Sequence, residues 1–419
     1  MTNRKADNTG YKDSPLGKIP SDWEVKKLKE ILIEGRLGGN YENAEANNGI
    51  PVIKMGNLDR GVIKTDKVQY LPEDNECNEE DILKENDLLF NTRNTLELVG
   101  KVAIWKNELP FAVYNSNLMR MKFDDKWIQS NAYMNYAFNS HYVLSQLKGR
   151  ATGTTSVAAI YGRDLDSVRF LLSPLSEQTR IAEVLSAWDK AISNVQATIE
   201  QVEQRNKWLM QELLTAKRRL KGFEGTKWGN KKLSDCLNYT PREVPKPSSS
   251  FFALGIRSHA KGIFHKNDFE PEDLAMDVLY EVMENDLIVN ITFAWEHAIA
   301  IAGKQDDGGL VSHRFPTYTF KTKNAIPDFF RYFILQKKFK YQLDLISPGG
   351  AGRNRVMSKK DFPKIEVAIP SVEEQKAIAN ILDNAFNELS LLRNKRDKLK
   401  EQKKGLMQVL LTGKKRLIV

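Results

Sequence analysis

The stretch Gln178-Thr-Arg-Ile-Ala-Glu-Val-Leu185 returns 197 residues later as Gln375-Lys-Ala-Ile-Ala-Asn-Ile-Leu382. A second stretch, Leu209-Met-Gln-Glu-Leu-Leu-Thr215, returns at the same offset as Leu406-Met-Gln-Val-Leu-Leu-Thr412. Because the offset is the same at both ends, neither copy has an insertion relative to the other. A loop would tolerate an insertion, whereas a helix whose length matters would not. The repeat therefore predicts two long helices of matched length.

Apolar residues in both copies fall on two rows with a spacing of seven residues, which is the pattern of a coiled-coil seam. We expect each helix to run for about 40 residues, or roughly 60 Å at 1.5 Å per residue. The apolar seam positions, which we also expect to serve partner docking, are Ile181, Leu185, Trp188, Ile192, Val195, Ile199, Val202 and Leu209 in the first copy and Ile378, Leu382, Leu389, Leu392, Leu399 and Leu406 in the second.

Three polar residues, Asn206, Arg396 and Lys403, also occupy seam positions. Polar residues in a seam lower stability but can fix the register and the partner. The alternative is that the helices splay there and leave a gap filled by solvent. An unpaired seam should find another copy of itself, so residues 1–221 alone are expected to form a closed homodimer.

Both helices have candidate start and stop signals. Ser176 and Ser371 are the expected N-caps, and Glu374 completes a capping-box pattern with Ser371. Gly222 and Gly225 are expected to end the first helix.

These signals divide the chain into four parts. We expect a first globular block at residues 1–173, a first long helix at 174–221, a second block at 222–369 and a second long helix at 370–419. Within the first block, the segment from Trp127 to Leu147 is expected to be helical.

The two globular blocks are related to each other as well. Glu85-Asn-Asp-Leu-Leu-Phe-Asn91, expected to contain a strand, matches Glu284-Asn-Asp-Leu-Ile-Val-Asn290, and Trp23-Glu-Val-Lys-Lys-Leu28 matches Trp228-Gly-Asn-Lys-Lys-Leu233. Such residues recur while the stretches between them differ. One scaffold with two different binding surfaces would have this pattern.

Composition favours a cytoplasmic protein with a polyanionic partner. The net charge is +9 over 419 residues, and the two cysteines, Cys77 and Cys236, are too few for a disulfide framework. No apolar run has the length of a membrane span, and the polar N-terminal residues do not resemble a signal peptide. We therefore expect no membrane association.

Motifs for catalysis are missing from the sequence. It contains no GxxxxGK[ST] phosphate loop, no glycine-rich GxGxxG turn and no Asn-Pro-Pro-aromatic run. The five histidines do not pair with cysteines or carboxylates at metal-ligand spacing. The expectation is a chain without catalytic, cofactor-binding or metal-binding residues.

The doubled Gln-x-x-Ile-Ala-x-x-Leu opening, the doubled Leu-Met-Gln-x-Leu-Leu-Thr closing, the Ile19-Pro-Ser-Asp-Trp23 leader and the Asn86–Asn91 strand resemble the specificity subunit of type I restriction–modification enzymes. The resemblance covers nearly the whole chain. One departure is that Gly222-Phe-Glu-Gly-Thr-Lys-Trp228 replaces the Gly-Lys-Ile-Pro leader in the second block, which affects only that turn.

The resemblance implies an α+β tandem repeat with a pseudo-twofold axis: two related α/β target-recognition domains separated by two long antiparallel helices that form a coiled coil. Each domain would read one half of a bipartite, asymmetric site in double-stranded DNA. The chain itself would not be an enzyme. It would bind two modification subunits, which carry S-adenosylmethionine and methylate adenine, and restriction subunits, which use ATP and Mg to translocate and cut DNA in phage defence.

Candidate DNA contacts are polar, amide and arginine residues in the stretches that differ between the blocks, because arginine can bind guanine and asparagine can bind adenine with two hydrogen bonds. The candidates are Asn57, Arg60, Arg93, Asn94, Asn115, Asn117, Arg150, Thr154 and Arg163 in the first block and Arg257, Ser258, Lys261, Arg314, Arg353, Asn354 and Arg355 in the second.

Two other classes remain open at this stage. One is a coiled-coil interaction scaffold that binds only proteins, and the other is an enzyme with an unrecognised site. Salt-dependent, sequence-selective DNA binding in the presence of a methyltransferase partner would separate these classes from a specificity subunit.

Overall fold

The computed structural model describes residues 10–42, 45, 49–72, 75–154, 158–349 and 355–417. The chain forms two compact units, one of residues 1–196 with 394–419 and the other of residues 197–393. The expected bounds, which list blocks and long helices as separate parts, stay a prediction. Each compact unit holds one block, the first half of the long helix that follows it and the last half of the other.

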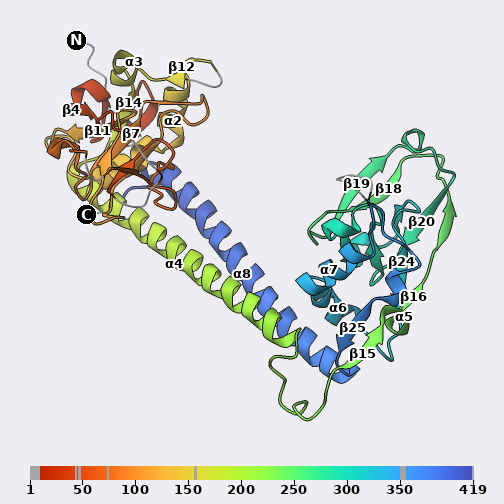
Figure 1. The fold of residues 1–419 in the computed structure, drawn as a ribbon. Coiled ribbons are helices and arrows are strands. Elements are labelled where there is room, and N and C mark those ends of the chain that lie inside the picture. The colour runs from red at the N-terminus through yellow and green to blue at the C-terminus, as the bar shows by residue number, and fades with distance from the viewer. Residues whose placement is uncertain are drawn as a thin grey trace. The chain divides into compact units, whose positions relative to one another are not determined.

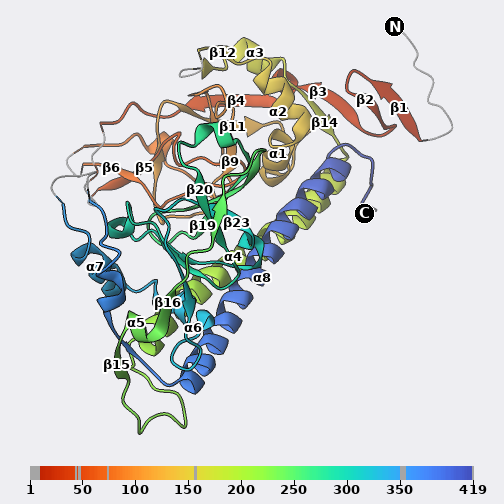
Figure 2. The same cartoon turned by 90° about the vertical axis from the view of Figure 1, so that its right-hand side faces the viewer.

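The two long helices are α4, Leu175–Leu213, and α8, Val372–Leu410, with 39 residues each. They lie side by side (Figures 1 and 2). Both end earlier than the sequence suggested, since Ala216 and Gly413, at the repeat offset, adopt left-handed conformations with φ of 57° and 69°. A left-handed residue stops a helix at its C-terminus.

The two expected N-caps differ in outcome. Ser176 was the wrong choice, because α4 already begins at Leu175, directly after Pro174. Ser371 is confirmed, since its Oγ accepts the Glu374 backbone N–H at 3.3 Å. The Glu374 carboxylate does not complete a capping box; it binds Arg219.

The first block is built from small, mostly antiparallel sheets and three short α-helices, with one parallel pair, β10–β5. A hairpin, β1–β2, precedes β3, which pairs with β14 next to the long helix. The remaining sheets have the orders β4-β11-β7-β9, β10-β5-β6 and β12-β13-β8. The bounds are β1 Tyr11–Ser14, β2 Gly17–Pro20, β3 Glu24–Lys27, η1 Leu28–Glu30, β4 Leu32–Leu37, β5 Ile50–Ile53, β6 Gln69–Leu71, η2 Glu79–Asp81, β7 Leu88–Asn91, β8 Arg93–Asn94, β9 Val102–Ile104, β10 Val113–Tyr114, β11 Leu118–Phe123, α1 Asn131–Phe138, α2 His141–Lys148, β12 Thr152–Gly153, β13 Ala158–Ala159, α3 Gly162–Asp166 and β14 Arg169–Leu172.

The second block repeats this plan with a larger outer sheet. The pair β15–β25 corresponds to β3–β14, and the order β16-β24-β21-β22 corresponds to β4-β11-β7-β9. The outer sheet has five strands, β17-β20-β23-β18-β19. The bounds are β15 Gly229–Lys232, α5 Leu233–Cys236, β16 Leu237–Tyr239, β17 Glu243–Pro245, β18 Phe251–Ile256, β19 Ile263–Phe269, η3 Pro271–Asp273, β20 Val278–Val282, β21 Leu287–Val289, η4 Ala294–Glu296, β22 Ile299–Ile301, η5 Lys304–Asp306, β23 Gly309–Val311, β24 Thr317–Phe320, α6 Pro327–Phe333, α7 Lys337–Leu345, η6 Phe362–Lys364 and β25 Glu366–Ile369.

Local expectations in the first block largely hold. The strand expected within Glu85–Asn91 is β7. The segment from Trp127 to Leu147 contains two helices, α1 and α2, rather than one, because the chain turns at Asn139. In the described part of the chain, no helix is long and apolar enough to cross a membrane.

Each hydrophobic core contains the beginning of one long helix and the end of the other. In the first unit, Ile181 and Leu185 pack in one cluster with Leu410 and Leu411. In the second unit, Ile378 and Leu382 share a cluster with Leu213 and Leu214. The repeated closing motif of each repeat is therefore a core element of the other repeat's block.

The heptad seam is confirmed, because every expected seam position is buried or half-buried. The polar seam residues are paired between helices. Asn206, only 1% exposed, donates to the Ala385 carbonyl at 2.8 Å, and Lys403 binds Asp189 at 2.6 Å. These contacts run antiparallel and argue against a splayed, solvent-filled gap.

In each unit, an ion pair between an arginine and a buried glutamate joins the end of one long helix to the start of the other. In the second unit, Arg219 binds Glu374 through two bonds of 2.7 and 2.8 Å, and the Glu374 side chain is only 2% exposed. In the first unit, Arg416 binds Glu177 in the equivalent way and also Asp22, whose pKa it lowers. Each arginine follows one long helix, and each buried glutamate begins the other.

Replacing Glu374 by glutamine should lower the free energy of unfolding of the second unit by about 3 kcal/mol, because removing one partner of a buried ion pair leaves the other charge uncompensated. Urea unfolding followed by far-UV circular dichroism measures this change. Glu373→Gln, on the exposed neighbour, is the control and should change little. A loss for Glu374→Gln that Arg219→Met does not partly restore would contradict the pairing.

Candidate nucleic-acid interface

The two blocks share a corner at the end of their central strand. In the first block the buried Asn91 accepts the backbone N–H of Arg93 through its Oδ1 at 3.2 Å. In the second block, Asn290 accepts the N–H of Thr292 at 3.0 Å. An asparagine that bonds the backbone two residues on makes a local turn. The residues after this turn leave the core.

Two further segments meet this corner in both blocks. Thr92 N–H donates to the Asn117 carbonyl at 3.0 Å, and its own carbonyl accepts from Ile160 at 3.1 Å. In the second block Ile291 N–H donates to Arg314 at 3.0 Å and its carbonyl accepts from Met357 at 2.8 Å. Candidates far apart in the sequence are thereby brought together in each block.

In the first block, five of the candidate DNA contacts lie on the segments that meet at this corner. Arg93, Thr154 and Arg163 are exposed, and Asn94 and Asn117 are half-exposed. Arg93 and Asn94 form β8, which pairs with β13 in the small sheet that β12 completes beside Thr154. Among the described residues, none forms a hydrogen bond with the guanidinium of Arg93 or Arg163, so both can bind an incoming group. We call these five residues surface 1.

Two asparagine candidates of the first block are buried. Asn57 is 5% exposed, and its side chain bonds the backbone of Lys54, Lys64 and Lys67 at 2.8–3.0 Å. Asn115 is 7% exposed and caps the backbone N–H of Asn117 at 3.3 Å. Both amides hold their own loops, so they are left out of surface 1.

Two arginine candidates of the first block are also used internally. Arg150 donates to the Ser167 hydroxyl at 2.7 Å and to the Gln146 carbonyl at 2.9 Å. Arg60 donates to the Glu97 carbonyl at 3.5 Å, and burial lowers the pKa of its guanidinium. These contacts give both arginines a structural role.

In the second block the candidates gather around η4. The tip of the β18–β19 hairpin docks on this turn, since His259 N–H donates to the Glu296 carbonyl and Ala260 N–H to the His297 carbonyl, both at 2.8 Å. The tip carries Arg257, Ser258 and Lys261. Lys261 is exposed, Ser258 is bonded to the Glu296 carboxylate, and the exposed Arg257 lies over Phe264.

The remaining candidates of the second block differ in accessibility. Arg314 is exposed and donates to the Thr292 hydroxyl at 3.2 Å. Arg355 is held internally by Asp344 at 2.7 Å and lies over the Trp295 ring. Arg353 and Asn354 lie outside the described residues.

Two side chains at the second corner, the half-exposed Thr292 and the exposed Phe293, were missed by the sequence analysis. Thr292 and Phe293 occupy the positions that Arg93 and Asn94 hold in the first block, and Phe293 is 40% exposed. The match between Glu85–Asn91 and Glu284–Asn290 already contained the signal, because the next residues follow the same turn. Surface 2 is defined as Arg257, Lys261, Thr292, Phe293 and Arg314.

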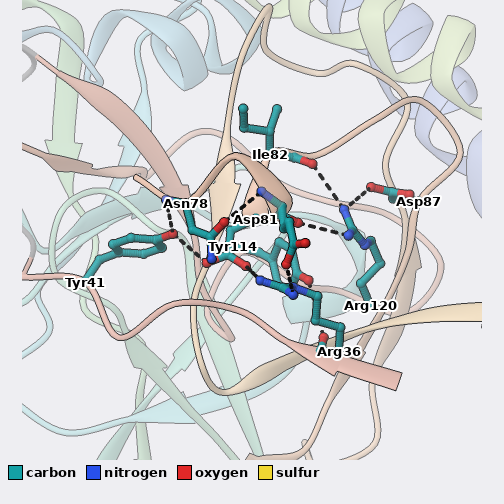
Figure 3. A network of polar contacts seen from close by, with 9 residues as sticks. Arg36, Tyr41, Asn78, Asp81, Ile82, Asp87, Tyr114 and Arg120 are labelled. Atoms are coloured by element: carbon teal, nitrogen blue, oxygen red, sulfur yellow. Dashed lines mark hydrogen bonds and ion pairs between the residues drawn. The ribbon is translucent and has the colours of Figure 1, made fainter. Parts of the chain in front are cut away.

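A polar network at the edge of the first block engages two other arginines (Figure 3). Arg36 binds Asp81 at 3.3 Å, Tyr41 donates to the same carboxylate at 2.5 Å, and Arg120 binds Asp87 at 3.3 Å. Burial and the Asp81 bond raise the pKa of Tyr41 to about 12. The network ties β4 and β11 to the segment between η2 and β7. Its two arginines are paired with carboxylates of the protein, whereas no described residue binds the guanidinium of Arg93.

Metal chemistry has no visible site in the described part of the chain. It contains no group of three or more histidine, cysteine, aspartate or glutamate residues that could hold an ion.

Comparison with known proteins assigns the chain to one family. The family model described as the type I restriction modification DNA specificity domain matches residues 20–204 and 280–401, more than half of the chain. The chain belongs to this family. With two such repeats, the chain has the domain organisation of a type I restriction–modification specificity subunit.

Curated relatives carry the same description, and one of them matches over nearly the full length of the chain. A Methanocaldococcus jannaschii protein provisionally named the MjaX specificity subunit of a type I restriction enzyme is 26% identical, with 97% of each chain covered. The MjaVIII specificity subunit from the same organism is 30% identical over 52% of this chain and 51% of its own. The solved S subunit of a type I system from M. genitalium shares the fold, with a TM-score of 0.58, 15% identity and coverage of 97% and 98%.

Replacing Arg93 by alanine should weaken DNA binding by the complex with its modification partner, whereas Arg120→Lys should not, because Arg120 is bonded within the protein. A base contact would cost about 1–3 kcal/mol and relax one position of the target, whereas a phosphate contact would reduce the salt slope by about one. Fluorescence anisotropy over a salt series separates the two. Unchanged affinity and slope for Arg93→Ala would remove Arg93 from surface 1.

Proposed function

We propose that each block reads one half of a bipartite, asymmetric target in double-stranded DNA, the first through surface 1 and the second through surface 2. The observation that carries the proposal is that two copies of one scaffold present different exposed side chains at equivalent corners. A shared frame holds each corner through a buried asparagine, Asn91 or Asn290. Different side chains on equal frames would read different bases.

The chemistry of the two surfaces differs in a way that suits this role. Surface 1 offers arginine and amide groups, which can bind guanine and adenine in the major groove. Surface 2 combines the hydroxyl and methyl of Thr292 and the ring of Phe293 with the cationic side chains of Arg257, Lys261 and Arg314, of which Arg314 donates to the Thr292 hydroxyl. Apolar groups can contact the thymine methyl, and cations can bind phosphate. The net charge of +9 supports binding to a polyanion.

In this proposal the chain directs chemistry that other subunits perform. Two modification subunits would carry S-adenosylmethionine, and restriction subunits would use ATP and Mg. The names of the relatives, which are specificity subunits of restriction enzymes, support this division of work. The tandem repeat supports two modification subunits, because a duplicated chain offers a second copy of each docking surface.

Methylome sequencing of cells that carry the chain with its modification partner tests the proposal. A methylated motif of two unlike half-sites separated by unspecified bases is expected, and variants in surface 2 should alter only one half. An undivided motif, or variants in one surface that alter both halves, would contradict the assignment of one half-site to each block. Methylation that persists without the chain would contradict the function itself.

The spacing between half-sites is expected to depend on the paired helices. Deleting Val195–Gln201 together with Leu392–Lys398 removes one heptad from each helix and keeps both seam rows in phase. Each helix would shorten by about 10 Å. At about 3.4 Å per base pair the half-sites should move closer by up to about three pairs, while the bases read at each end stay the same.

A change of three pairs also rotates one half-site by about 100°, at roughly 10.5 pairs per turn. The shortened protein is therefore expected to accept a smaller change in spacing or to lose binding. Methylome sequencing of the double-deletion strain measures the outcome. Full activity at the original spacing would show that the helices do not set it.

A further inference from the structure

The two long helices have the same length and repeat but carry different charges at their midpoints. Gln196, Thr198 and Ile199 of α4 are replaced at the repeat offset by Arg393, Lys395 and Arg396 of α8. From Arg393 to Lys404, α8 has seven basic and two acidic residues, whereas the equivalent stretch of α4 has two of each. The midpoint matters because it lies at the dyad of any antiparallel pair of equal helices.

In the native pairing these cations find neutral or acidic groups on α4. Arg396 donates to the Gln196 side chain at 3.1 Å, and Arg393 binds Glu203 at 2.5 Å. Further along α8, Lys403 binds Asp189 at 2.6 Å and lies over the Tyr136 ring. Each of these contacts lies within one unit, and each is made to a side chain of the first repeat.

A pair of two α8 helices would lose all of these partners. The antiparallel register that joins Asp189 to Lys403 and Asn206 to Ala385 can be carried over by the repeat offset. It then centres an α8–α8 pair near residue 394. Arg393, Lys395 and Arg396 from both copies would gather at the dyad, six cations within about one helical turn. Lys403 would face Ala385 of the other copy, without an acid in the place of Asp189.

A pair of two α4 helices has no such obstacle at its midpoint. The same register centres it near residue 197 and sets Val195 against Ile199 of the other copy. The facing positions on either side, such as Ile192 and Val202, are apolar as well. The polar exception is Asn206, which would face Trp188. Self-pairing of α4 is therefore compatible with its seam.

We propose that α8 pairs only with an α4-type helix and rejects a second copy of itself, whereas α4 accepts both. The partner that fits α8 is a helix that is uncharged at the three midpoint positions and acidic where Lys403 falls. The first repeat can then form the homodimer expected from an exposed seam, whereas the second repeat cannot. Assemblies formed from separated repeats always contain α4.

The test uses the full chain with a protease site inserted between Gly222 and Gly225. Isotopically heavy and light preparations are purified, cut, mixed and warmed until the pieces have exchanged, and native mass spectrometry identifies the pairs. Exchange between heavy and light heterotypic complexes shows that pieces separate and pair again. Pairs of two second pieces are expected at least about tenfold below pairs of two first pieces, a ratio that corresponds to about 1.4 kcal/mol.

A triple variant isolates the cause. Arg393→Gln, Lys395→Thr and Arg396→Ile give α8 the midpoint of α4 and should raise self-pairs of the second piece by about tenfold or more. The control removes three exposed cations of the same helix that do not face the midpoint cations in the carried-over register, as Lys376→Gln, Lys398→Gln and Lys404→Gln. The control should change self-pairing much less than the midpoint variant.

Salt provides a second measurement on the unaltered protein. Raising the ionic strength from 0.15 to 1 M shortens the screening length from about 8 to about 3 Å, so self-pairs of the second piece should increase. The proposal fails if second pieces pair as readily as first pieces in the unaltered protein. It also fails if the midpoint variant keeps its heterotypic pair but gains no self-pair, or, should that variant not fold, if salt leaves the ratio unchanged.

Discussion

Two buried carboxylates, Glu177 and Glu374, are neutralised by arginines that follow the end of the other repeat's long helix. Each carboxylate side chain is about 2% exposed. A charge in such a position destabilises the fold unless it is paired. Each arginine belongs to the other repeat. Neither block can therefore neutralise its buried glutamate until the end of the other repeat's long helix packs against it. The same exchange inserts Leu213 or Leu410 into the neighbouring core.

This constraint explains why the frame of the repeat is so regular. Gln178 and Gln375 are fully buried at the start of the long helices, and each amide donates to two backbone carbonyls, one in its block and one before its helix. A side chain with that role cannot vary without loosening both elements. At the corners after Asn91 and Asn290, the asparagine side chain itself holds the backbone, and the side chains that follow it do not have this structural role. Variation can therefore collect at the corners while the frame stays fixed.

The elements that could be predicted from the sequence are those in which burial repeats at a regular residue spacing. The heptad rows predicted the seam because burial along a helix follows a spacing that can be read directly. The end of α4 was misplaced because the left-handed residue there is Ala216 rather than a glycine. Candidate contacts were harder, since an asparagine looks the same whether it is buried like Asn57 or half-exposed like Asn94. Phe293 was overlooked because an aromatic residue is more often part of a core.

The first unit contains both ends of the described chain. Tyr11 in β1 donates through its hydroxyl to the Gly413 carbonyl at 3.2 Å, across 402 residues of sequence. Two repeats that each complete the other's core, in a chain whose first and last described segments are in contact, have the connectivity of a ring cut once. In a ring the order of the repeats has no physical meaning, and only the position of the cut does.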